Sequence, residues 1–152
     1  MPTHVIVGPK PRRTVKLLRG LACGAWIVTG DWVRSAEAES GLGSGGEEKY
    51  QVGVSVIPGA RRGRERKDGD GLLEGVHVCV GRLSAKDMDR RDLEELLQMC
   101  GAIVHLEPVW AQIYIVGKGV TRTTTAKAAL QAALSSTQVT DVVTAEWFFD
   151  SI

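Results

Sequence analysis

The sequence predicts an α/β protein with two consecutive small units, each built on a parallel sheet. Short apolar runs of strand length alternate along the chain with stretches of helical periodicity. Two segments far apart in the chain repeat the same order of residue types, and a polar, glycine-rich stretch lies between them. A chain of 152 residues with 43% hydrophobic and 24% charged residues is long enough for two small globular domains.

Strands and helices are expected in alternation. The apolar runs with the length of buried strands are His4–Val7, Trp26–Val28, Val76–Val80, Ile103–His105, Ile113–Val116 and Val142–Val143. The stripes at helical spacing are Val15, Leu18, Leu21 and Ala22, then Leu93, Leu96, Leu97 and Cys100, then Ala126, Ala129, Leu130 and Ala133. Gly24 and Gly101 follow the first two stripes, where helices commonly stop.

Two polar segments interrupt this pattern. Ser40–Gly46 has the composition of a flexible loop, and Pro58–Gly71 has the composition of a linker. The basic cluster in the linker fits either a solvated connector or a patch for nuclear import or nucleic acid. We therefore divide the chain into the C-terminal part of a first repeat at 1–52, a linker at 53–70 and a second repeat at 71–152.

The internal repeat is the most informative feature. The matching segments are Ile6–Gly8 with Ile115–Gly117, Thr14 and Lys16 with Thr125 and Lys127, and Ile27–Val33 with Val142–Phe148, the last pair at an offset of 115. In each copy of that last pair, a strand leads to a Thr that caps a helix, an acid in the first turn and a Trp that faces the core. Three matches in the same order indicate a duplication.

The second copy has an opening strand in Leu72–Val80 and an opening helix in Asp92–Cys100. Nothing before Thr3 corresponds to them. The sequence therefore predicts that the first repeat begins in its middle and that the second stops inside its final helix at Ile152. On this interpretation the chain is a fragment at both ends.

No motif for catalysis, for a metal or for a membrane span is found. There is no apolar run of about 18 residues, and the apolar start is too short for a secretory signal. His4, His77 and His105 lack metal-like spacing with the three cysteines, and Gly117–Thr121 lacks the spacing of a phosphate-wrapping loop. We predict no catalytic residue, no metal, no cofactor and no enzymatic activity. An odd number of cysteines without CxxC spacing suits reduced thiols in the cytosol or nucleus.

Charge is distributed unevenly although the net charge is only +1. Residues 1–46 carry a net charge of +3, and residues 71–152 carry −3. This distribution fits either chance scatter over solvated faces or an anionic ligand near the N-terminal segment.

The ordered set of motifs resembles BRCT repeats, in the tandem arrangement of the breast-cancer-susceptibility protein and its RING-domain partner. The segments that carry the resemblance are Thr3–Ile6, Arg13–Lys16, Gly24–Val28, Glu47–Tyr50, Leu97–Ala102, Val143–Trp147 and the linker start Pro58–Arg62. The resemblance implies a four-stranded parallel sheet flanked by helices in each repeat, incomplete in the first and cut in the last helix of the second. It also implies head-to-tail packing of the repeats and binding of phosphoserine peptides across the groove between them.

The start of the helix at Val15 is the predicted phosphate site. Thr14 can cap this helix, whose first N–H groups and positive dipole end attract an anion, and Lys16 adds a full charge. By resemblance, Lys16 occupies the position of the family's phosphate-contacting lysine. Arg13 occupies the position of an arginine that holds the peptide backbone near the third residue after the phosphoserine. The alternative is a solvated basic helix face.

Three further residues are assigned to the peptide groove by resemblance. Met88 occupies a methionine position that lines a hydrophobic pocket, Leu18 occupies a phenylalanine position in the same pocket, and Asp87 replaces an asparagine that contacts the peptide. The serine and glycine that complete the family's phosphate pocket have no counterpart, and Ala145 replaces an arginine of the groove. The pocket is therefore predicted to be incomplete, with specificity for an aromatic third residue open. Thr125 and Lys127 are interpreted as structural.

We expect a phosphoserine-peptide-binding adaptor of the DNA-damage response and DNA repair, as part of a larger nuclear protein. One alternative is a BRCT scaffold that works without phosphate or binds DNA. Another is an accessory region of a RING ubiquitin ligase or a DNA ligase. The expected partner is a phosphorylated protein, with a RING-domain heterodimer partner through regions outside this chain, nucleic acid as a secondary ligand, and no membrane.

Overall fold

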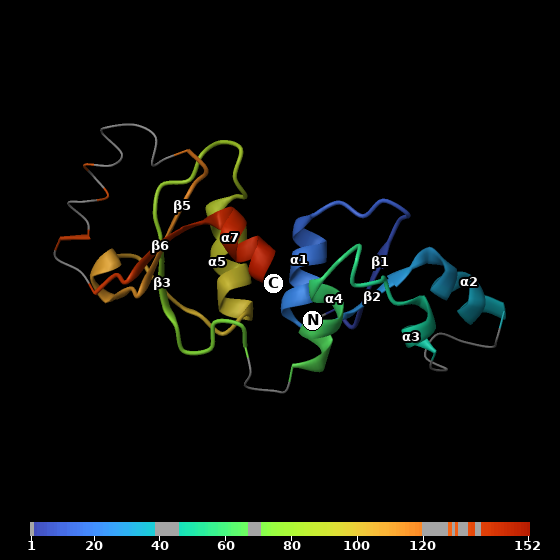
Figure 1. Cartoon of the computed structure of the whole chain (residues 1–152). Coiled ribbons are helices and arrows are strands. Elements are labelled where there is room, and N and C mark those ends of the chain that lie inside the picture. The colour runs from blue at the N-terminus through green and yellow to red at the C-terminus, as the bar shows by residue number, and fades with distance from the viewer. Residues whose placement is uncertain are drawn as a thin grey trace. The chain divides into compact units, whose positions relative to one another are not determined.

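The computed structural model describes residues 2–38, 46–66, 71–119, 128, 130, 134–135 and 138–152. The chain forms two compact units, Met1–Lys67 with Ile152, and Asp68–Ser151 (Figure 1). Most of the predicted helix at 126–133 and most of the predicted loop at 40–46 lie outside the described residues. None of the helices that the structure describes is both long enough and apolar enough to cross a membrane.

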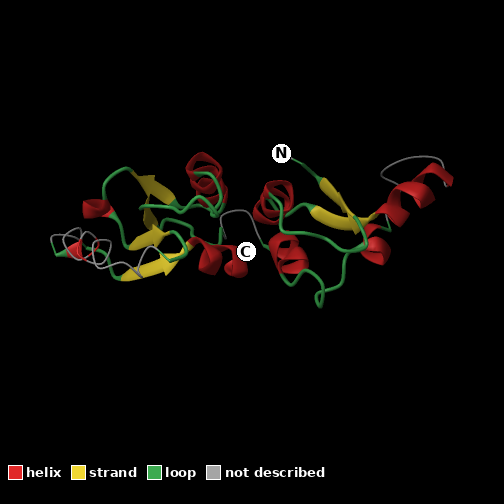
Figure 2. Ribbon diagram, turned by 90° about the horizontal axis from the view of Figure 1, so that it is seen from above, coloured by secondary structure: helices red, strands yellow, loops and turns green. Residues whose placement is uncertain are grey.

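The first unit is built around a two-stranded parallel sheet. Its elements are β1 (His4–Val7), α1 (Val15–Ala22), β2 (Trp26–Thr29), α2 (Gly30–Ala38), α3 (Glu47–Tyr50) and α4 (Gly59–Glu65). The strands pair in parallel with Ile6 opposite Val28, and α1 makes the crossover between them. Helices α1 and α4 lie on one side of the strands, and α2 and α3 lie on the other (Figures 1 and 2).

The core of this unit forms where α1 covers β2. Ile27 and Val28 are fully buried, and Leu17, Leu18 and Leu21 of α1 are at most 6% exposed. Gly20 lets the helix approach the sheet closely, because a Cβ at this position would lie 2.5 Å from Cγ2 of Val5. The apolar stripe of α1 is therefore a packing surface, as its periodicity predicted.

Helix α4 lies inside the segment interpreted as a linker, so residues 59–65 are helical although their composition is typical of a flexible connector. Ala60 and Gly63 are buried on the side that packs against α1. A Cβ at Gly63 would collide with the carbonyl oxygen of Leu21. The guanidinium of Arg64 lies 3.8 Å from the centre of the Trp26 ring. Small residues and a stacked arginine thus give tertiary contacts to a sequence of linker-like composition.

The second unit is a four-stranded parallel sheet flanked by helices, as the sequence predicted. Its elements are β3 (His77–Val80), α5 (Arg90–Met99), β4 (Ile103–His105), the short 3-10 helix η1 (Pro108–Trp110), β5 (Ile113–Val116), β6 (Asp141–Thr144) and α7 (Ala145–Ser151). The strand order is β4-β3-β5-β6. Helices α5 and α7 lie on the same side of this sheet (Figures 1 and 2). Their side chains Leu93, Leu96, Leu97 and Phe148 are fully buried.

The internal repeat is confirmed by strand register. Ile6 lies opposite Val28 in the first unit, and their counterparts Ile115 and Val143 lie opposite each other in the second. The predicted cap in the second copy is also confirmed, because Oγ1 of Thr144 accepts a hydrogen bond of 3.3 Å from N–H of Trp147.

The two tryptophans of the repeat differ in burial. Trp32 is 8% exposed and stacks on His4, with 4.4 Å between ring centroids and 9° between ring planes. Trp147 is 42% exposed, so the prediction that it faces the core was wrong. Its neighbour Phe148 is the fully buried aromatic residue of α7. Ile113, which occupies the strand position of His4, offers no aromatic ring for stacking.

Candidate functional site

The N-terminal end of α1 gathers three of the predicted site residues. Thr14 is the N-cap, with an extended backbone, and its Oγ1 accepts a hydrogen bond of 3.3 Å from N–H of Leu17. No acidic residue lies in the first turn, and the side chain of Lys16 is exposed. Arg13, also exposed, directly precedes the cap. This helix end combines free N–H groups, the positive end of the helix dipole and full positive charges.

Leu18, the fourth predicted residue of the first unit, is only 2% exposed. It lies two residues after Lys16, on the opposite, buried side of α1. Its assignment to a ligand pocket stays a prediction, whereas its place in the apolar packing of α1 is a structural finding.

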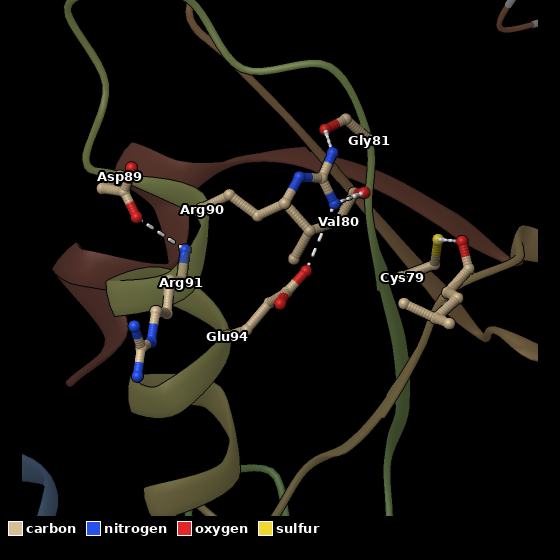
Figure 3. Close-up of polar contacts among 8 residues, drawn as sticks. Cys79, Val80, Gly81, Asp89, Arg90, Arg91 and Glu94 are labelled. Carbon is tan, nitrogen blue, oxygen red and sulfur yellow. Dashed lines mark hydrogen bonds and ion pairs between the residues drawn. The ribbon is translucent and has the colours of Figure 1, made fainter.

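In the second unit, Arg90 holds the end of β3. Its Nη1 donates to the carbonyl oxygen of Val80 at 2.7 Å, and its Nη2 donates to that of Gly81 at 2.6 Å (Figure 3). Nη1 also donates to Oε1 of Glu94 at 3.2 Å. Asp89 caps α5 by accepting a bond of 2.9 Å from N–H of Arg91. These bonds fix the start of α5 against the carboxyl end of β3.

Asp87 and Met88 lie just before this cap, and both are partly exposed. Oδ2 of Asp87 accepts a bond of 2.6 Å from N–H of Ser84, and Oδ1 accepts one of 3.3 Å from N–H of Lys118. Partial burial acts to raise the pKa of Asp87. The hydrogen bonds from Ser84 and from the backbone of Lys118, with the charge of Lys118, outweigh it and hold that pKa below its ordinary value.

The sequence did not reveal the partners of Asp87 or of Arg90. Both side chains bond to main-chain atoms. Main-chain donors and acceptors are present at almost every residue, so the sequence does not indicate which residue is the partner. Lys118 lies 31 residues after Asp87, so only the fold brings the two together. The Asp89 cap, by contrast, is a local signal, since an aspartate directly before an amphipathic stretch is a common helix start.

The histidines and cysteines form no larger cluster in the part of the chain that the structure describes. His77 and His105 stack with 4.9 Å between ring centroids, and their Nδ1 and Nε2 atoms lie 2.7 Å apart. Among the described residues, no three His, Cys, Asp or Glu side chains are placed to hold a metal ion. The three cysteines are free. Burial raises the pKa of the Cys79 thiol, which makes it a poor nucleophile.

Comparison with known proteins decides the family. Residues 69–152 match the BRCA1 C Terminus (BRCT) domain family. The chain belongs to the BRCT family. This match covers the whole second unit, including the four-stranded sheet and the Arg90 and Asp87 contacts. The predicted resemblance to BRCT repeats is therefore confirmed.

Curated relatives carry the match into the first unit. The breast cancer type 1 susceptibility protein homolog of Rattus norvegicus is 34% identical over 110 residues, which is 67% of this chain. The homolog of Mus musculus is 33% identical over 112 residues, also 67% of this chain. In each case the aligned part spans only 6% of the relative's length.

Two solved structures show the same fold. The BRCT5-BRCT6 domains of S. pombe Brc1 superpose with a TM-score of 0.53 and 20% identity, over 75% of this chain and 60% of that one. Residues 820–1070 of Rtt107p superpose with a TM-score of 0.56 and 12% identity, over 98% of this chain and 68% of that one. The chain thus has the BRCT fold, is related to BRCA1, and belongs with protein-interaction modules.

Proposed function

We propose that this chain binds phosphoserine peptides as an adaptor module in the DNA-damage response. The observation that carries the proposal is the exposed Lys16 in the first turn of the Thr14-capped helix α1, in a chain of the BRCT family. A dianionic phosphate is the ligand that suits this end of a helix best, because it accepts bonds from N–H groups and from a lysine at once.

Local charge supports a phosphate rather than a neutral ligand. Among the described residues, no carboxylate lies within ion-pair distance of Lys16, and the first turn of α1 holds no acid. Lys10, Arg12 and Arg13 are exposed or partly exposed in the segment between β1 and α1, or directly before the cap. The field at this end of the first unit is therefore positive and favours an anion.

The rest of the peptide would be held by Arg13 at its backbone and by Leu18 and Met88 at an apolar third residue. Met88 suits this role because its thioether side chain is adaptable and remains partly exposed. Asp87, the sixth assigned residue, has both of its carboxylate oxygens engaged by N–H groups of the protein's own backbone.

We further propose that the module works in the nucleus, a proposal that rests on the similarity to the BRCA1 homologs. Its partner would be a phosphorylated protein, and a RING-domain partner would bind through other regions of a larger protein. The competing candidate is a BRCT scaffold that binds without phosphate or contacts DNA. The basic residues around Arg13 favour this candidate only if they bind phosphates of nucleic acid.

Fluorescence anisotropy with two peptides tests the proposal. The peptides differ only in phosphorylation of one serine and carry a phenylalanine three residues after it. We expect the chain to prefer the phosphopeptide, and Lys16→Met to remove most of that preference. The cost should be roughly 1.5–3 kcal/mol, or about ten- to a hundredfold in affinity.

Two matched variants serve as controls. Lys49→Met removes an exposed lysine of α3 in the same unit, and Lys127→Met removes the counterpart of Lys16 in the second copy. Both should change affinity by less than about twofold. Equal affinity for the two peptides, or equal losses from Lys16→Met and Lys127→Met, contradicts the proposal. A steep dependence of log affinity for duplex DNA on log salt would instead favour the nucleic-acid alternative.

A further inference from the structure

Two histidines of the second unit lie side by side at the edge of its sheet. His77 is the first residue of β3, and His105 is the last residue of β4. Among the strands that the structure describes, β4 pairs only with β3, and both histidine side chains are partly exposed. The two residues lie 28 positions apart along the chain, so it is the parallel pairing of the strands that brings them together.

The two rings meet through their nitrogen atoms. Nδ1 of His77 lies 2.7 Å from Nε2 of His105, and the ring planes differ by only 10°. A hydrogen bond between two neutral imidazoles needs one ring as donor and the other as acceptor. The pair therefore holds a single proton between two basic nitrogen atoms. A transition-metal ion can take the place of this proton, because neutral imidazole nitrogen is a common metal ligand.

The spacing of these nitrogen atoms is close to that of a zinc site. Zn–N bonds of about 2.0–2.1 Å at a tetrahedral angle place two ligand nitrogens roughly 3.3 Å apart. The pair must therefore open by less than about 1 Å, and partly exposed side chains can do this by small rotations. The ring that donates in the hydrogen bond moves its proton to its other nitrogen. Both rings then stay neutral, and no proton is lost.

The backbone that carries His77 is fixed before any metal arrives. Its N–H donates to Oε1 of Gln112 at 3.0 Å, and its carbonyl oxygen accepts a bond of 2.8 Å from N–H of Gln112. Among the described residues, no carboxylate forms an ion pair with either ring of the pair. A ligand with a held backbone and no charged competitor loses little freedom when it binds an ion.

Cys79 does not complete the ligand set. It lies opposite His105 in the strand register, but its side chain is buried and its Sγ donates to the carbonyl oxygen of Leu106 at 3.7 Å. In the described part of the chain, no third His, Cys, Asp or Glu side chain is placed to join the pair. Water fills the remaining coordination positions of such a site, which makes it more open than a structural zinc site with four protein ligands.

We propose that Nδ1 of His77 and Nε2 of His105 bind one divalent transition-metal ion such as Zn²⁺, which joins the edge strand β4 to β3. The ion closes a connection of 28 residues and holds a strand of three residues that is paired on one side. Mg²⁺ is excluded, because it prefers oxygen ligands. The site lies within the second unit and is independent of the proposed peptide binding.

Isothermal titration calorimetry with zinc chloride tests the site. We expect the chain to bind one Zn²⁺ and no Mg²⁺ under the same conditions. His77→Gln and His105→Gln should each weaken zinc binding by at least about tenfold, since each removes one of the two protein ligands. The control is Cys23→Ser, which removes the one cysteine of the three that is not buried and should leave the zinc affinity unchanged.

Amide hydrogen exchange tests the effect of the ion on the sheet. Zinc should slow exchange at Ile103, whose N–H donates to the carbonyl oxygen of Val76, and leave exchange at Leu18 in the first unit unchanged. Unchanged exchange at Ile103 in the zinc-bound chain overturns the joining of β4 to β3.

Three results overturn the metal site itself. They are no zinc binding by the unchanged chain, equal zinc affinity in both histidine variants and the unchanged chain, or a loss of zinc affinity in Cys23→Ser, which assigns the ion to a thiol. Thermal unfolding without zinc checks the variants, and both should unfold near the temperature of the unchanged chain, because the substituted side chains are partly exposed. If a histidine variant does not fold, hydrogen exchange of the unchanged chain with and without zinc decides.

Discussion

The carboxyl ends of the two sheets are built from the same repeat and present different chemistry. In open parallel sheets this edge is where ligands commonly bind. In the first unit, β1 leads into a basic segment and a capped helix whose Lys16 is exposed. In the second, Arg90 binds the end of β3 and Asp87 binds the chain after β5. In the first copy the side chain of Lys16 is exposed, and in the second Arg90 and Asp87 bond to main-chain atoms of their own unit.

The comparison of the two copies shows that a shared backbone arrangement does not by itself conserve a binding site. Matching registers give the two copies the same strand positions, yet the chain after β5 binds Asp87, a residue of the opening part of the second copy that has no counterpart in the first. A carboxylate on the second copy's edge provides internally the negative charge that a phosphate would bring to the first. Function in such a duplication is therefore assigned by residue rather than by fold.

The largest expected effect on the free energy of unfolding comes from substituting a tryptophan of the repeat. Trp32→Ala should destabilise the first unit by about 3–5 kcal/mol, because it removes a buried ring stacked on His4. Trp147→Ala should cost about 1 kcal/mol or less, because that ring is 42% exposed. Urea denaturation followed by circular dichroism measures both. Phe148→Ala should cost about as much as Trp32→Ala, and equal costs for the two tryptophans would contradict the difference between the copies.

Arg90 and its neighbour Arg91 should differ in how much their side chains contribute to the stability of the second unit. Arg90→Met removes the donors to the carbonyl oxygens of Val80 and Gly81 (Figure 3). We expect a loss of about 1–2 kcal/mol, at the low end for charged bonds because half of the Arg90 side chain is exposed. Arg91→Met should change stability by less than about 0.5 kcal/mol, because Arg91 bonds to the Asp89 cap only through its backbone N–H. Thermal unfolding measures both, and similar losses would remove the special role of Arg90.

In helix α4, helix propensity and side-chain packing have opposite effects on stability at Gly63, and the two effects are similar in magnitude. Ala has a higher helix propensity than Gly, by roughly 1 kcal/mol, so propensity alone predicts that Gly63→Ala stabilises the protein. The new Cβ would collide with the carbonyl oxygen of Leu21, and overpacking of this kind costs about 1–3 kcal/mol. We expect the packing cost to exceed the gain in helix propensity, so that Gly63→Ala lowers the free energy of unfolding by about 1 kcal/mol. Gly8→Ala, with no atom near the added Cβ, should be nearly neutral, and a stabilised Gly63→Ala variant would show that α4 can move away from α1.

The sequence predicted the strands because buried strands leave a direct trace in short apolar runs, and β1 and β4 have the predicted bounds. It missed α4 because glycine, arginine and glutamate are typical of linkers, and only contact with α1 makes this segment a helix. The Thr14 cap was predictable because capping is local. The bond from N–H of Lys118 to Asp87 was not predictable, since the two residues lie far apart along the chain. Local signals were thus visible in the sequence, and contacts made through the backbone were not.

The smallest expected effect is the pH dependence of the two hydrogen bonds that the Asp87 carboxylate accepts from N–H of Ser84 and N–H of Lys118. The folded-state pKa of Asp87 lies below its ordinary value of 3.8, so its contribution to stability is present above that value. It is lost as the pH falls through the folded pKa, because a protonated carboxyl no longer accepts both bonds as an anion. Asp87→Asn removes one acceptor and should cost about 1 kcal/mol or less at neutral pH. The difference in unfolding free energy between the two proteins should stay constant between about pH 7 and pH 5 and shrink as the pH falls below 3.8 toward the folded-state pKa of Asp87. Urea denaturation at several pH values measures it. A difference that does not depend on pH would mean that the charge of Asp87 contributes nothing to the strength of its bonds with Ser84 and Lys118.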